Sequence, residues 1–377
     1  MWKIPLFDLN YTHEETDATV EVLNSRWLVS GPKVKEFEDN FASYLGHGVK
    51  ACAVTNCTAA LHMSLLVAGI KEGDEVIVSS LSFVAALNVI SVVGATPVLA
   101  DSKSFSDWNI SVEDVSRKIS SKTKAVIVVH YAGYPSDLDE LQKLCQEKNI
   151  ILIEDVAHAI GAEYKGQQCG TFGDISCFSF FGNKNLSTGE GGMIVTKKEE
   201  LDKKVRLWRS HGMTSMTVDR HEGKIISYDV LQPGLNYRMT EITAAIGLVQ
   251  LRKLDKSNKV RKDLTAAYHK SLSEIKNLII PWANLESYKT SSYHIMPVLL
   301  PEGTERLKVI NDLKSEGIQT SIHYPSYKNF SYYKELLKDK IEVIEQVCQR
   351  ELTLPLYPDM KIESVYQVCE AMKKSLK

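Results

Sequence analysis

Between residues 50 and 200, short apolar runs rich in valine and isoleucine alternate with segments that have helical periodicity. The apolar runs cover residues 51–54, 75–79, 97–100, 125–130 and 150–153. Nearly continuous apolar runs are typical of strands buried on both faces, and strands separated by helices favour a mainly parallel sheet. Ligands of such sheets bind at the carboxyl ends of the strands. The alternation therefore predicts an α/β fold with a functional site at that edge.

The segments on either side of this alternation predict an arm and a second, smaller unit. The predicted helices are 14–25 and 33–44 in the arm, 58–68, 84–93, 112–119 and 138–147 between the strands, and 241–254 and 257–278 in a mostly helical stretch. From residue 292 on, the pattern predicts strands 293–300 and 320–323, helices 304–316 and 362–376, and a tyrosine-rich helix after residue 325. We therefore expect a large domain over residues 1–255 and a small α/β domain over residues 256–377.

Composition narrows the classes of function. The chain has 377 residues and a net charge of -2, with acidic and basic residues interspersed, so nothing in it favours binding to nucleic acid or to a membrane surface. No apolar run approaches the length that spans a membrane. The seven cysteines are scattered without CxxC spacing, which favours reduced thiols in a cytoplasmic protein and no metal site.

Lys184 lies in an unusual sequence environment. An apolar run (residues 177–180) precedes it, and a glycine-rich segment (residues 189–192) leads into a second apolar run (residues 193–196). Lysines usually lie on solvated surfaces, whereas these glycines let other backbone or a ligand approach closely. A lysine held in such a place has a lowered pKa, and its free amine can form a Schiff base with a carbonyl group. The alternative is an ordinary loop lysine between two strands.

Other polar residues stand where strands end. Asp155 follows an apolar strand and either caps the next turn or pairs with a protonated pyridine nitrogen, which keeps such a ring electron-withdrawing. Thr58 and Ala59 begin a predicted helix, where free N–H groups can bind phosphate or where Thr58 simply caps the helix. The hydroxyl of Ser179, at the end of the strand before Lys184, could reach the same phosphate.

Two ring side chains are further candidates. Phe83 follows the predicted strand 75–79 and either stacks on an aromatic ligand or belongs to the core. His158 follows Asp155 closely and is either a core histidine or a second contact to the ring. Three other kinds of site lack their motifs. No GxGxxG of a dinucleotide-binding fold follows a strand, no GxxxxGK[ST] of a phosphate-binding P-loop occurs, and no His/Cys cluster has zinc spacing.

An ordered set of motifs now identifies a family. The motifs are residues 27–38 (WLVSGPKVKEFE), 58–61 (TAAL), 73–78 (GDEVIV), 93–98 (VGATPV), 154–155 (ED), 158–159 (HA), 173–174 (GD), 178–180 (FSF), 184–192 (KNLSTGEGG), 209–212 (RSHG), 236–238 (NYR), 323–325 (HYP) and 354–358 (LPLYP). In this order they resemble the DegT/DnrJ/EryC1/StrS family of sugar aminotransferases. The resemblance implies pyridoxal 5'-phosphate (PLP) as cofactor and the aspartate aminotransferase-like fold, fold type I.

The resemblance also implies roles for the candidate residues. Lys184 corresponds to the lysine that binds PLP as a Schiff base, Asp155 to the partner of the pyridinium nitrogen, and His158 to a residue beside it. Phe83 takes the stacking position. The phosphate contacts implied by the resemblance are Thr58, Ala59 and Ser179.

Three more positions follow from the resemblance. Asn236 resembles the asparagine that reaches the phosphate from the partner subunit, which implies a homodimer with shared active sites. His323 stands where family members have a histidine near the sugar. Cys57 is a departure, because the family usually has glycine there, and a positive φ at this position would strain a cysteine.

The activity implied is transfer of an amino group from L-glutamate to a nucleotide-linked keto-sugar. The residues before Lys184, Gly182 and Asn183, resemble members that act on 4-keto sugars and make polysaccharide or O-antigen precursors. Alternatives are a cyclitol aminotransferase, a lyase of the same fold, and a binding protein that has kept the fold without catalysis. A nicotinamide dehydrogenase is disfavoured because its glycine turn is missing.

Overall fold

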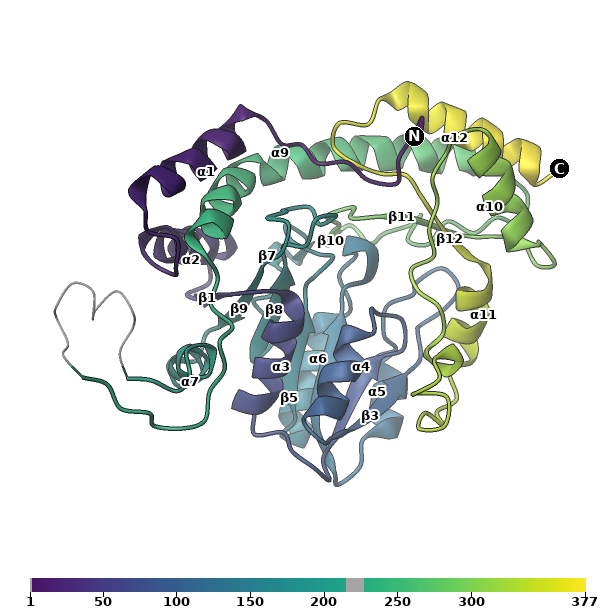
Figure 1. Cartoon of the computed structure of the whole chain (residues 1–377). Coiled ribbons are helices and arrows are strands. Elements are labelled where there is room, and N and C mark those ends of the chain that lie inside the picture. Colours follow the sequence, from purple (N-terminus) through teal and green to yellow (C-terminus); the bar gives the residue numbers. More distant parts are fainter. Residues whose placement is uncertain (1, 215–226) are drawn as a thin grey trace.

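The computed structural model describes residues 2–214 and 227–377 (Figure 1). The helices are α1 His13–Ser25, α2 Pro32–Leu45, α3 Cys57–Val67, α4 Ala85–Val92, α5 Val112–Lys118, α6 Leu138–Lys148, α7 Glu199–Arg209, α9 Glu241–Leu272, α10 Arg306–Ser315, α11 Glu342–Arg350 and α12 Ile362–Ser375. The strands are β1 Lys50–Val54, β2 Glu75–Ser79, β3 Thr96–Ala100, β4 Thr123–Val129, β5 Ile151–Asp155, β6 Glu163–Tyr164, β7 Gln167–Gln168, β8 Ile175–Ser179, β9 Gly192–Thr196, β10 Lys289–Thr290, β11 Met296–Leu299 and β12 Glu351–Leu354.

A seven-stranded sheet with the order β1-β9-β8-β5-β4-β2-β3 forms the centre of the molecule. β9 is antiparallel to both of its neighbours, and the remaining pairs are parallel, so the predicted mainly parallel sheet is confirmed. The side chains of β4 show why its apolar run is continuous. Ala125 and Ile127 belong to the core that contains α3 and α4, whereas Val126 and Val128 belong to the core that contains α5 and α6. Both faces of the strand are therefore buried.

Local sequence signals account for the starts of several helices. Thr12 and Glu15 form a capping box at α1, and Asn56 and Thr240 cap α3 and α9 through their side chains. The predicted cap of α5 is confirmed, because the Ser111 hydroxyl accepts a hydrogen bond from the N–H of Asp114.

The N-terminal arm is fixed to α9 by one carboxylate. Glu241, the first residue of α9, accepts hydrogen bonds of 2.9 Å from the N–H groups of Gly31, Lys33 and Val34 at the start of α2. These are the N–H groups that a helix leaves without intrahelical partners. Figure 1 shows α9 running from the arm helices to the C-terminal unit, where it packs against α12.

Several predicted elements differ from the structure. Helices 241–254 and 257–278 are one helix, α9, because no glycine or proline stands between them to interrupt it. Residues 199–280 were expected to be mostly helical, and α7 and α9 lie in this range, whereas the described part of 210–240 has no helix. The boundary predicted after residue 255 lies within α9, and the division into two domains stays a prediction.

The C-terminal unit contains the other differences. Residues 320–323 form no strand and make only an isolated bridge, Ser321 to Thr353. The tyrosine-rich segment has a short 3-10 turn, Tyr327–Asn329, in place of a helix. The prediction missed α11 and β12, and β12 pairs antiparallel with β11.

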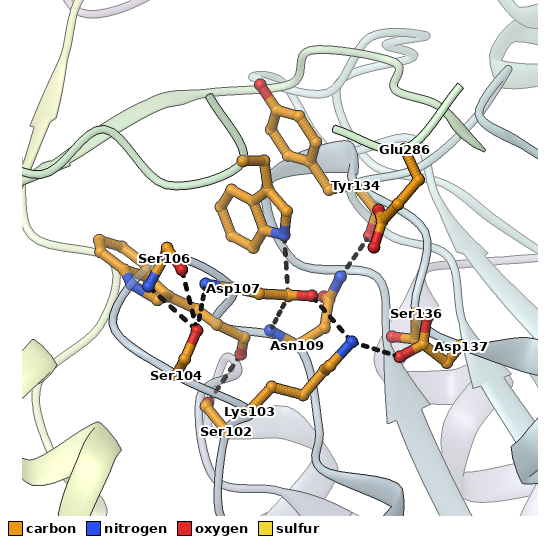
Figure 2. Close-up of polar contacts among 12 residues, drawn as sticks. Ser102, Lys103, Ser104, Ser106, Asp107, Asn109, Tyr134, Ser136, Asp137 and Glu286 are labelled. Carbon is orange, nitrogen blue, oxygen red and sulfur yellow. Dashed lines mark hydrogen bonds and ion pairs between the residues drawn. The ribbon is translucent and has the colours of Figure 1, made fainter. Parts of the chain in front are cut away.

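A cluster of polar residues, with Lys103, Asp107, Asn109 and Asp137 among its members, joins the loops that follow β3 and β4 by hydrogen bonds and ion pairs (Figure 2). The amine of Lys103 pairs with Asp137 at 2.6 Å and with Asp107 at 3.4 Å. The indole N–H of Trp282 donates to Asp107 at 2.8 Å, and the Asn109 amide donates to the carbonyl of Tyr134 at 3.0 Å. The cluster thus fixes the chain that follows α9 to the carboxyl edge of the sheet.

Two searches of the described residues complete the description. None of their helices is both long enough and apolar enough to cross a membrane. No group of three or more histidine, cysteine, aspartate or glutamate residues among them could hold a metal ion.

Candidate active site

A cavity of about 440 Å³ lies at the carboxyl ends of β5 and β8. The residues predicted from the sequence that line it are Thr58, Phe83, Asp155, His158, Ser179, Lys184 and His323. Asn183, noted above for its place before Lys184, also lines the cavity, and lining residues that sequence reasoning did not select include Asn56, Leu61, Glu190 and Tyr324. The structure therefore brings together groups from several strand ends, as expected for a mainly parallel sheet.

Lys184 is held by the residues around it. Its N–H donates to the carbonyl of Phe181 at 2.9 Å, which closes the turn after β8. The next side chain, Asn185, is buried and donates to Asn258 and to the carbonyl of Ser292, both at 2.8 Å. Burial lowers the pKa of the Lys184 amine to about 8, although the nearby charge of Asp155 opposes that shift. About a tenth of the amine is thus free at pH 7, far more than for an ordinary lysine.

Asp155 is the last residue of β5 and is only 8% exposed. One carboxylate oxygen accepts a hydrogen bond from the N–H of Ala157 at 3.0 Å, so Asp155 does stabilise the following turn. Within the described ranges, its other oxygen makes no hydrogen bond. Burial raises the pKa of Asp155, while the Ala157 N–H and the charge of Lys184 lower it. A buried carboxylate with a free oxygen in a cavity is suited to a cationic ligand group.

The turn between β1 and α3 forms another wall of the cavity. The side chain of Asn56 accepts a hydrogen bond from the N–H of Ala59 at 2.8 Å, so Asn56 rather than Thr58 is the cap. Ala59 does not line the cavity, whereas Thr58 and Ser179 bring hydroxyl groups to it. Cys57 is not among the residues with positive φ, so a cysteine fits here without backbone strain.

His158 is satisfied at both ring nitrogens. Its Nδ1 accepts a hydrogen bond from the N–H of Ala132 at 3.3 Å, and its Nε2 lies 3.1 Å from the Tyr324 hydroxyl. Burial lowers the pKa of His158 well below its usual value, so the ring stays neutral. His158 is therefore both an internally satisfied histidine and a wall of the cavity.

Phe83 also lines the cavity. Its side chain is 59% exposed, and its ring centroid lies 5.8 Å from that of Tyr324.

Asn236 lies elsewhere. It is exposed, forms an isolated bridge with Ser210 and does not line the cavity of its own chain. Its predicted contact from a partner subunit stays a prediction.

Tyr324 was not selected from the sequence although it directly follows His323, because one tyrosine among many carries no pattern of its own.

The comparisons with known proteins show to which family the chain belongs. A sequence profile of the DegT/DnrJ/EryC1/StrS aminotransferase family matches residues 10–373. The chain belongs to this family. It is 36% identical to GDP-perosamine synthase of Escherichia coli O157:H7, with 98% of each chain covered. It is 37% identical to the spore coat polysaccharide biosynthesis protein SpsC of Bacillus subtilis (strain 168), over 97% of this chain and 95% of that one.

A solved structure shows the same fold. The putative sugar aminotransferase Spr1654 of Streptococcus pneumoniae, in its PMP form, matches with a TM-score of 0.91 and 30% identity. The match covers 100% of this chain and 98% of that one. This member of the DegT/DnrJ/EryC1/StrS family is thus a PLP-dependent sugar aminotransferase of fold type I.

The residues present fit PLP. Asp155 offers an unpaired carboxylate oxygen for a pyridinium nitrogen, and Lys184 offers an amine with a lowered pKa for an aldehyde. Cys57 and Thr58, at the start of α3, line the cavity and their N–H groups have no intrahelical acceptors, whereas the N–H of Ala59 is taken by Asn56; the hydroxyls of Thr58 and Ser179 lie in the same cavity. A dianionic phosphate suits that end of the cavity.

Proposed function

We propose that the protein transfers an amino group from L-glutamate to a nucleotide-linked keto-sugar, with a 4-keto-6-deoxy sugar as the expected acceptor. The proposal is supported by its 36% identity to a GDP-perosamine synthase, whose name specifies a nucleotide-linked sugar product. The likeness to a spore coat polysaccharide biosynthesis protein supports a product used in polysaccharide assembly.

The observation that carries the proposal is that Lys184 and Asp155 line one cavity together with His323 and Tyr324. Lys184 and Asp155 are suited to the cofactor, and His323 and Tyr324 add polar ring groups to the same cavity. At about 440 Å³, the cavity lies within the range of small-molecule sites.

We assign the following roles within this proposal. Bound PLP supplies an electron sink and an aldehyde that carries the amino group. Asp155 holds the proton on the ring nitrogen, and the hydroxyls of Thr58 and Ser179 bind the phosphate. The Lys184 amine, once free, would take a proton from the α-carbon of L-glutamate in one half-reaction, and in the other it would deliver a proton to the former carbonyl carbon of the sugar. Its pKa of about 8 suits a group that must do both near neutral pH.

We also propose a homodimer in which Asn236 of one subunit completes the phosphate site of the other. The support is that Asn236 is exposed and does not line the cavity of its own chain. A residue that binds the phosphate from that position has to do so in a second copy.

The test is incubation of the purified holoenzyme with 15N-labelled L-glutamate and a panel of nucleotide-linked 3-keto and 4-keto sugars. Products are identified by mass and NMR. We expect 15N in one sugar product and stoichiometric 2-oxoglutarate. Label in a cyclitol but in no nucleotide sugar would instead establish the cyclitol alternative. Ammonia release without labelled product would indicate a lyase.

A further inference from the structure

A chain of three hydrogen-bonding residues leads from the cavity into the core of the C-terminal unit. His323 Nδ1 lies 2.9 Å from the hydroxyl of Thr353, and that hydroxyl is hydrogen-bonded to Oε1 of Glu351. The other carboxyl oxygen of Glu351 accepts from the backbone N–H of His323 at 2.9 Å. Glu351 and Thr353 are both fully buried, whereas His323 lines the cavity.

The backbone explains why these residues meet. Ser321 and Thr353 exchange backbone hydrogen bonds of 3.1 and 2.8 Å, so the segment before His323 runs antiparallel to β12. The segment is further held by the Tyr131 hydroxyl, which donates to the carbonyl of His323. Within the described ranges, Nε2 of His323 is the ring nitrogen without a hydrogen-bond partner.

We infer that Glu351 and Thr353 are positioning residues that form a proton relay with His323, through which His323 Nε2 exchanges a proton with a group bound in the cavity. In one state Glu351 is protonated and donates to Thr353, whose hydroxyl donates to Nδ1. Nε2 then carries the ring proton. In the other state Thr353 donates to the Glu351 carboxylate, Nδ1 carries the ring proton and Nε2 is an acceptor.

The two states differ by one proton. When Nε2 releases its proton into the cavity, the Thr353 proton moves to Nδ1 and the Glu351 proton moves to the Thr353 oxygen. The negative charge therefore appears on Glu351, away from the cavity, while the ring remains neutral. The same donor and acceptor atoms serve both directions, so no side chain has to move.

The surroundings of the relay are consistent with an exchange near neutral pH. Burial raises the pKa of Glu351 to about 8, against the opposing effects of Thr353, the His323 N–H and Arg306. Burial, and after it the nearby charge of Lys184, lower the pKa of His323 to about 4, so the ring exchanges tautomers rather than gaining charge. The titratable or charged groups that act on Glu351 or are acted on by it are Arg306 of α10, Cys348 of α11, Tyr131, His323 and Tyr324.

The statement that a substrate oxygen meets Nε2 rests on the proposed function, but the tautomer of His323 can be measured without any sugar. Holoenzyme labelled with 15N-histidine is studied by solid-state NMR from about pH 6 to about pH 10. The His323 signals are assigned by their loss in His323→Gln. We expect the ring proton to move from Nε2 to Nδ1 in a single step near pH 8.

Three variants separate a relay from a merely structural contact. In Glu351→Gln the amide donates to Thr353 at every pH, so we expect Nε2 to stay protonated throughout. Thr353→Val should abolish the step, and Thr353→Ser should restore it. Glu342→Gln, which removes an exposed carboxylate from α11, is the matched control and should titrate like the wild type.

The wild-type measurement alone can overturn the inference. A His323 tautomer that does not change across this pH range would exclude the relay, even if the variants failed to fold. A step that persists unchanged in Glu351→Gln would also exclude it. If the step is present but no keto-sugar is aminated, the relay stands and the proposed substrate is wrong.

Discussion

Gly192→Ala tests how the phosphate end of the site is built. In β9, Gly192 pairs with Val54 on one side and with Ser179 on the other, so it lies between the two strands that lead to the phosphate contacts. A Cβ at Gly192 would lie 2.5 Å from the carbonyl carbon of Asn56 and 2.8 Å from the N of Cys57. Both are backbone atoms at the start of α3. To reach the 3.4 Å at which ordinary contact begins, the Asn56 carbon would have to retreat by about 0.9 Å and the Cys57 nitrogen by about 0.6 Å.

Forcing an extra carbon into such packing typically costs about 1–3 kcal/mol. If the strain is relieved by moving the start of α3, its N–H groups and the Thr58 hydroxyl move away from the phosphate. We then expect the Kd for PLP to rise by about 5-fold to about 150-fold. Apoprotein is titrated with PLP and followed by the absorbance of the lysine-bound cofactor. The melting temperature of the apoprotein is measured alongside.

Gly182→Ala is the matched control, because a Cβ there would find only the carbonyl oxygen of Gly189, at 4.0 Å. This variant should bind PLP like the wild type. The reasoning is refuted if Gly192→Ala binds PLP with unchanged affinity and melts at the wild-type temperature. A fall in melting temperature with unchanged PLP affinity would show that β9, rather than α3, absorbs the strain.

Four further predictions concern the cofactor site. Lys184→Ala should lose the absorbance of lysine-bound PLP and at least about 10²–10⁴-fold in turnover, because the proton-transferring amine is gone; retained steady-state transamination would contradict the assignment. The rate at which apoprotein binds PLP should rise about tenfold per pH unit below pH 8 and then level off, since the free amine reacts and its pKa is about 8; a plateau reached only near pH 10.5 would show an unshifted lysine. Asp155→Asn should retain PLP but lower kcat, because the ring nitrogen loses its charged partner; unchanged kcat at saturating PLP would remove Asp155 from that role. Asn236→Ala should speed loss of PLP on dialysis in a protein that sediments as a dimer, and a fully active monomer would rule out the shared site.

The large domain could be predicted well because its signals are local. The buried strands are apolar runs, and two of the helices between them, α3 and α5, start at a side-chain cap, Asn56 and Ser111. The candidate residues followed from the same logic, because Asp155 and Ser179 end their strands and the carboxyl ends of parallel strands meet at one edge. Their placement in one cavity is what this topology requires.

The C-terminal unit was predicted less well because its pairing is nonlocal. β12 directly follows α11 without a glycine or proline between them, so the sequence does not mark where the helix ends. Residues 320–323 have strand-like composition but make a single bridge, from Ser321 to Thr353, on the edge of β12 that β11 leaves free. The contacts of Glu351 with His323 depend on this tertiary pairing, and no pattern in the sequence points to them.

Burial gives Lys184 and Asp155 opposite pKa shifts within one cavity. It destabilises the charged amine and lowers its pKa, and it destabilises the carboxylate and raises its pKa. A ligand that presents a cationic nitrogen to Asp155 and an electrophilic carbon to Lys184 satisfies both groups at once, whereas a ligand with only one of these features leaves the other group desolvated. Selectivity for PLP over other phosphorylated aromatic compounds therefore follows from these two buried groups together, and the phosphate contacts add affinity without distinguishing between such rings.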